Sequence, residues 1–220
     1  MYATRPKRPL LLVALALLLT AGVGLRIWWV NTHIPAILTP PALEVYQIGQ
    51  WVPLEGSFQF SNDEHTENFH VQLVDIDFCT PQEFAQRYNL ELSLFGEDEA
   101  NLPEYVADLT LNFRNDSPDE ASDLGHILFM FYELFTPGSL KTFSPHSEVN
   151  WAMHPDLGIK LEFKIPPASE TGPVHFCLTS YVEATGPVKG NLDQFPKQLQ
   201  VSITPVRKVI EVPAPDALPS

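Results

Sequence analysis

An apolar run over residues 10–30 is bracketed by basic residues and contains no acidic one. The four basic residues around it are Arg5, Lys7, Arg8 and Arg26, whereas all 27 acidic residues of the chain lie after position 31. At about 1.5 Å per residue, a helix of this length covers the roughly 30 Å hydrocarbon core of a bilayer. The sequence therefore predicts a transmembrane signal-anchor helix at residues 10–30, after a basic leader at residues 1–9.

The charges around this segment also predict its orientation. No Lys or Arg occurs between Ile27 and Gln86, so the positive-inside rule places the N-terminus in the cytoplasm and the rest of the chain outside the membrane. Arg26 can extend its side chain to the lipid headgroups, and Trp28 and Trp29 suit the membrane interface. A cleaved signal peptide is the alternative, but the small residues at positions 20–24 form no A-x-A cleavage site, which favours an uncleaved anchor.

Proline marks both ends of the remaining chain. Residues 31–44 contain Pro35, Pro40 and Pro41, which predicts an extended stalk, and residues 206–220 have the composition of a C-terminal tail. The segment between them, residues 45–205, is long enough for one domain with a substantial core. The chain has 27 acidic residues against 13 basic ones, and this excess argues against a nucleic-acid partner.

The central segment has the period of two that is typical of half-buried strands. Apolar residues alternate with polar ones over residues 105–113, 159–165, 174–178 and 199–203. The apolar phase changes within residues 69–78, which predicts a β-bulge between Leu73 and Val74. Thr80, Pro81 and Glu83 form a capping box with proline at the first helical position, so a helix of about two turns should extend through Tyr88.

The most apolar stretch outside the anchor is residues 127–135, ILFMFYELF. It predicts a central strand buried on both faces, with an exposed partner-binding strand as the alternative. Together with the short strands and the single helix, this predicts a mainly β domain. We expect an antiparallel β-sandwich of immunoglobulin-like type.

The chain has two cysteines, Cys79 and Cys177. An exported location permits a disulfide between them, and both the paired and the free state fit the sequence. Strand parity places both thiols off the main core faces. A bridge would therefore join neighbouring strands of one sheet.

Two acidic loops carry possible cation ligands: Asp63, Glu64, His65, Glu67 and His70 in the first, and Asp116, Asp119, Glu120 and Asp123 in the second. Neither has the spacing of an EF-hand or of a tetrahedral zinc site, so solvated turns are the favoured interpretation. His146 and His154 could serve a hydrolase, but the sequence has no G-x-S-x-G, S-x-x-K or H-E-x-x-H motif. We therefore predict no catalytic residue, metal or cofactor.

Several aromatic residues could form a platform for stacking on sugar rings. The main candidates are Trp51, Trp151 and Tyr181, with Tyr46 and Tyr105 beside them. Packing in the core is the more ordinary role for such residues.

The order of these segments resembles a set of uncharacterised single-pass bacterial cell-envelope proteins. The resemblance covers roughly residues 45–205 and includes YQIGQWVPLEGSF at residues 46–58, LNFRNDS at 111–117, and the segment 163–167 leading into 174–181. It implies an extracytoplasmic immunoglobulin-like domain of unknown function and transfers no catalytic residue.

These observations predict a membrane-anchored, extracytoplasmic binding or accessory module of the cell envelope. A protein or peptide partner is the favoured ligand, and pairing with an edge strand is one mode of binding. A carbohydrate- or wall-polymer-binding module and a cation-dependent hydrolase are the alternatives.

Overall fold

The computed structural model describes residues 17–29, 41–59, 64–97, 101–118, 125–129, 132–136, 140–159, 161–180 and 195–214. The chain divides into two units, Met1–Pro40 and Pro41–Ser220. In the first unit a helix covers residues 17–29, and its side chains are exposed. No helix within the described ranges combines the length and apolar character needed to cross a membrane. Residues 1–16 and 30–40, which include parts of the leader, the expected span and the stalk, lie outside the described residues.

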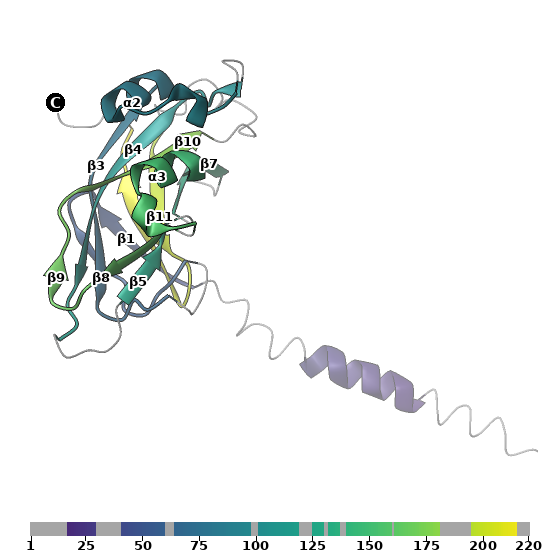
Figure 1. Cartoon of the computed structure of the whole chain (residues 1–220). Coiled ribbons are helices and arrows are strands. Elements are labelled where there is room, and N and C mark those ends of the chain that lie inside the picture. Colours follow the sequence, from purple (N-terminus) through teal and green to yellow (C-terminus); the bar gives the residue numbers. More distant parts are fainter. Residues whose placement is uncertain are drawn as a thin grey trace, which may run out of the picture. The chain divides into compact units, whose positions relative to one another are not determined.

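The second unit is mainly β, which confirms the predicted class (Figure 1). Its elements are β1 Ala42–Gln47, β2 Trp51–Pro53, β3 Phe69–Cys79, α2 Pro81–Tyr88, η1 Leu92–Leu94, β4 Val106–Asn115, β5 Gly125–Leu128, β6 Glu133–Thr136, β7 Leu140–Pro145, α3 Ser147–Met153, η4 Pro155–Leu157, β8 Glu162–Ile165, β9 Ser169–Glu170, β10 Val174–Ser180, β11 Lys197–Ser202 and β12 Val206–Val212.

Ten of these strands form one sheet in the order β1-β12-β11-β6-β7-β10-β4-β3-β2, with β9 paired to β4. Strands β5 and β8 form a separate two-stranded sheet. All pairs are antiparallel except β1 with β12, which is parallel and differs from the expected all-antiparallel arrangement. The immunoglobulin-like sandwich stays a prediction.

The two ends of the large sheet approach each other. Strands β1 and β2 are separated by only a short turn, yet β1 pairs with β12 and β2 pairs with β3. Beyond β2, Phe58 forms an isolated antiparallel bridge with Thr204, which lies between β11 and β12. The sheet is therefore nearly closed, and β1 and β2 flank the remaining seam.

One main core lies on the inner face of the sheet. The alternating residues of β4, Ala107, Leu109, Leu111 and Phe113, are all fully buried in it, as the period of two predicted. Phe176 and Leu178 of β10 and Leu199 and Val201 of β11 join the same core. The bulge of β3 is also confirmed, because the β3–β4 register shifts between Leu73 and Asp75.

A second core lies under the helices. Figure 1 shows α2 at one end of the domain near β3 and β4, with β5, β8 and β9 at the other end. Thr80 caps α2, and the capping box with Glu83 is complete, as predicted. Phe84 of α2 and Val149 of α3 are fully buried and pack with Phe95 and Val106. The helices thus cover part of the outer face of the sheet.

Two segments inside the domain differ from the sequence-based expectations. The apolar stretch 127–135 is not one strand: it spans β5 and β6, which belong to different sheets, and Tyr132 N–H donates to Phe129 O between them. In the segment 159–165 only Glu162–Ile165 is a strand, because Leu161 has a positive φ of 49° and Ile159 lies in a turn.

The domain is also longer than expected at both ends. Strand β1 begins at Ala42, within the expected stalk, and β12 occupies Val206–Val212, within the expected tail. The physical reason for the second difference is burial, since Val209, Ile210 and Val212 are 0–1% exposed. Residues 206–212 therefore belong to the sheet.

Candidate functional site

The residues of the expected aromatic platform are engaged separately. Trp51 lies on β2, where the Arg114 guanidinium carbon is 4.6 Å from the centroid of its ring. Trp151 lies on α3, is 37% exposed, and donates its indole N–H to Ile159 O at 3.2 Å. Tyr181 lies outside the described residues. A sugar-binding platform stays a prediction.

The histidines of the acidic loops contact neighbouring strands. The rings of His65 and His126 have centroids 5.5 Å apart, and His126 Nε2 is 4.0 Å from a Glu162 carboxylate oxygen. His70 Nδ1 is 3.4 Å from Asp116. Within the described ranges, no three His, Cys, Asp or Glu side chains are placed to hold a metal ion. Asp63, Asp119, Glu120 and Asp123 lie outside those ranges.

Cys79 and Cys177 are both free and buried. Both lie in the second core under the helices, off the main core face as strand parity predicted. Cys79 is on β3 and Cys177 on β10, with β4 between them. Strands that are separated by one intervening strand lie about 9.6 Å apart. A disulfide requires its two Cα atoms to lie within roughly 7 Å of each other. The disulfide that the sequence permitted is therefore not formed.

The surroundings of both thiols disfavour the thiolate, which is the reactive form of cysteine. Burial raises the pKa of Cys79 to about 11, and it also raises the pKa of Cys177. Asn150 of α3 holds the backbone of Cys177, because its side chain donates to Cys177 O and accepts from Cys177 N–H, both at 2.8 Å. These contacts attach α3 to β10.

The Asp108 carboxylate on β4 is 3% exposed and contacts three side chains. It accepts hydrogen bonds from Arg87 Nη1 at 2.8 Å and from Tyr88 Oη at 2.7 Å, and both donors come from the last turn of α2. His175 Nδ1 on β10 is 3.2 Å from the other carboxylate oxygen. We call these four residues the Asp108 network.

The Asp108 network continues to the surface through Arg87. Its Nη2 donates to Asp77 at 2.6 Å, and the hydrogen bonds to Asp77 and Asp108 raise the pKa of the guanidinium. Burial and the hydrogen bond to Asp108 raise the pKa of Tyr88. Each group thus stabilises the charge state of its neighbour. The contacts fasten α2 to β3, β4 and β10.

A second buried charge lies at the seam of the sheet. The Lys208 side chain on β12 is 0% exposed, and its Nζ donates to Pro53 O of β2, to Glu55 at 3.0 Å and to Glu44 of β1 at 3.2 Å. Tyr46 Oη donates to Glu44 at 2.8 Å, and this bond lowers the pKa of Glu44. Burial raises the pKa of Tyr46 to about 12. Lys208 therefore joins β1, β2 and β12 through side-chain contacts.

The open side of β1 is one edge of the large sheet, and β2 forms the other end of the strand order. Leu43 is 55% exposed and Val45 is 45% exposed. Gln47 N–H donates to Gln50 Oε1, and Gln47 O accepts from Gln50 N–H, so the backbone of Gln47 points away from β12. Backbone groups alternate in direction along a strand, so those of Leu43 and Val45 also point to the open side.

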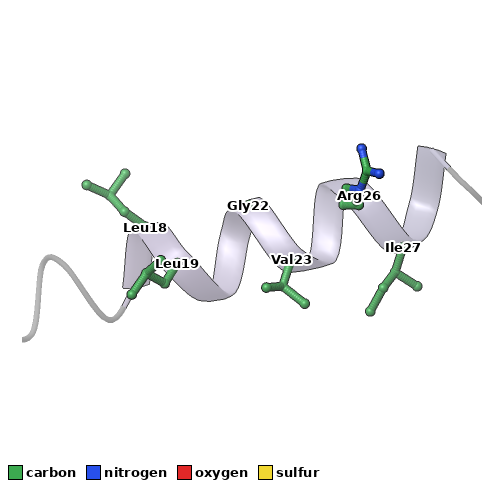
Figure 2. Close-up of a pocket in the computed structure, with 6 residues that line it drawn as sticks. All are labelled: Leu18, Leu19, Gly22, Val23, Arg26 and Ile27. Carbon is green, nitrogen blue, oxygen red and sulfur yellow. The ribbon is translucent and has the colours of Figure 1, made fainter.

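A hollow also runs along the helix at residues 17–29 of the first unit. It is lined by Leu18, Leu19, Gly22, Val23, Arg26 and Ile27. Figure 2 shows that all six come from successive turns of this one helix, with Leu19, Val23 and Ile27 on the same side. A groove whose walls come from one helix encloses no ligand.

A family model for a domain of unknown function, DUF5028, matches residues 43–208 of this chain. The chain belongs to the DUF5028 family. No curated protein and no solved structure shows a match to it. The expectation of a domain of unknown function is confirmed.

Sequence reasoning missed Asp108 and Lys208, which are two of the four buried charged residues in the described part of the DUF5028 domain. A signal existed for Lys208, because it has the same strand parity as Ile210 and Val212, which lie in the main core. The assignment of residues 206–220 to a tail concealed it. For Asp108 the alternation of β4 showed only an outward position, and nothing local showed that α2 would cover it.

Proposed function

We propose that this DUF5028 protein is a membrane-anchored, extracytoplasmic binding module that engages a protein or peptide partner and performs no catalysis. The anchor is the apolar run at residues 10–30, and the acidic domain lies outside the membrane. An immunoglobulin-like arrangement of the domain is part of this proposal. The open edge of β1 is the proposed binding surface, because an exposed strand edge can pair with a strand from another chain.

The arrangement of the buried charges supports a binding role over catalysis. A catalytic acid or base needs to reach a substrate, often in a concave pocket. The Asp108 carboxylate instead accepts from Arg87 and Tyr88 and is 3% exposed. Lys208 is likewise enclosed by oxygen partners at the seam. These groups stabilise the fold, and the exposed surface remains for recognition.

Protease treatment of sealed, whole cells tests the location. Added protease should digest the C-terminal domain under conditions that also digest a known surface protein and spare a cytoplasmic one. A domain that stays intact while the surface control is digested would overturn the proposed orientation.

Photo-crosslinking in intact cells tests the binding role. A photoreactive amino acid is placed, one position at a time, at exposed sites of the full-length chain, including Leu43 on β1 and Trp151 on α3. We expect at least one position to give a discrete, reproducible adduct that depends on irradiation. If no position gives an adduct, the binding role is wrong.

A further inference from the structure

We propose that the β1 edge binds an extended partner segment in which apolar and basic residues alternate. This inference rests on the proposed binding function and names the surface and the chemistry of the partner. It combines three observations: backbone groups of β1 that pair with no described strand on the open side, an apolar outer face of β1, and two carboxylates at the seam, Glu44 on β1 and Glu55 after β2.

The backbone supplies the first observation. Strand β1 is the first strand of the sheet order and pairs only with β12 among the described strands. The N–H and C=O groups of Leu43 and Val45 point to the open side, as the turn contacts of Gln47 indicate. An added strand can form main-chain hydrogen bonds with all four groups.

The outer face of β1 requires apolar side chains in the partner. Leu43 and Val45 are the exposed large hydrophobic residues of this strand. In a strand added beside β1, side chains on the same face would lie beside them, with Cβ atoms about 5 Å away. Apolar residues at every second position of the partner would therefore cover Leu43 and Val45.

The inner face requires basic side chains. Glu44 is 42% exposed and Glu55 is 68% exposed, and both carboxylates share the single ammonium group of Lys208. One negative charge is therefore left uncompensated beside the open edge. Residues 28–85 contain no Lys or Arg, and the other cation of β12, Arg207, pairs in register with Leu43 and so lies on the opposite face of the sheet from Glu44. A basic residue at the alternate positions of the partner would supply the missing charge.

The test uses two short synthetic peptides, one alternating valine with lysine and the other valine with glutamate. Binding to the full-length protein in detergent is followed by NMR amide exchange. In the free protein we expect fast exchange at Leu43 and Val45 and slow exchange at Glu44 and Tyr46. The valine–lysine peptide should slow exchange at Leu43 and Val45 about tenfold or more, and added salt should weaken this effect. The valine–glutamate peptide should have no effect.

Two variants of one residue separate backbone pairing from side-chain contact. Val45→Pro removes the N–H on the open side, and proline is tolerated on an edge strand, so binding should weaken about tenfold or more. Val45→Thr keeps that N–H and a β-branched side chain and should still bind. Slow exchange at Glu44 in Val45→Pro would show that β1 still pairs with β12.

The inference is overturned if the valine–lysine peptide leaves exchange at Leu43 and Val45 unchanged, or if it binds Val45→Pro as well as the natural protein. This failure differs from failure of the proposed function. Photo-crosslinks from Trp151 but none from Leu43 would leave the binding module in place and remove the β1 edge as its site. The absence of crosslinks from every position would remove both.

Discussion

Replacing Asp108 by Asn should destabilise the domain by about 2 kcal/mol. The amide keeps the shape of the carboxylate but loses its charge, and the carboxylate accepts two short hydrogen bonds, from Arg87 at 2.8 Å and Tyr88 at 2.7 Å. A hydrogen bond to a charged group contributes about 1 kcal/mol more than one to a neutral group. Because Asp108 is 3% exposed, water cannot replace the lost interaction.

Asp77→Asn is the matched control, since Asp77 binds the same guanidinium at 2.6 Å but is 52% exposed. Solvent screening should limit its cost to about 0.5 kcal/mol. Urea unfolding measures the free energy of unfolding of both variants. In a thermal melt, Asp108→Asn should lower the melting temperature of a domain of this size by about 4–8 °C. Equal costs for the two variants, or a cost below about 0.5 kcal/mol for Asp108→Asn, would refute the argument that burial sets the strength of this network.

Three further predictions concern the thiols, the histidines and the helix cap. Cys79 and Cys177 should react with a thiol reagent only after unfolding, and both should then react; fewer than two reactive thiols in the unfolded chain would indicate a bridge. Burial lowers the pKa of His146 and His154 in the folded state. Below the pKa of about 6.5 that a histidine has in the unfolded chain, the unfolded state therefore binds more protons than the folded state. The free energy of unfolding should therefore be lower at pH 5.5 than at pH 7.5, and His146→Phe should reduce this difference; equal values at both pH values in the natural protein would contradict it. Thr80→Ala should lower the free energy of unfolding by about 1 kcal/mol, as measured by urea denaturation, because it removes the cap of α2; an unchanged midpoint would show that the cap is dispensable.

The features predicted correctly from sequence are those that local physics determines. The alternation of β4 follows from one face meeting the core, and the bulge at Val74 follows from a change of phase in the same strand. The capping box of α2 needs only Thr80 and Glu83, three residues apart. None of these features depends on distant parts of the chain.

The features that sequence did not predict depend on distant contacts. The stretch 127–135 is uniformly apolar, so its period could not show the break between β5 and β6, which follows from pairing with β8 and β11. The separation of Cys79 and Cys177 depends on β4 lying between their strands. The Asp108 network likewise requires α2 to fold back over β4, which no local pattern encodes.

The seam explains how one edge of the sheet can stay open in a well-packed domain. Backbone pairing of β1 with β2 would close the sheet and remove the edge, but among the described strands β1 pairs only with β12 and β2 only with β3. Lys208 replaces that missing ladder with side-chain bonds to Glu44, Glu55 and Pro53 O. These bonds use the inner face of β1, and within the described ranges the backbone groups of Leu43 and Val45 on the open side pair with no strand. The seam contacts thus use side-chain atoms of β1, whereas the proposed partner would pair with its backbone groups, and only the Glu44 and Glu55 carboxylates would serve both Lys208 and the partner.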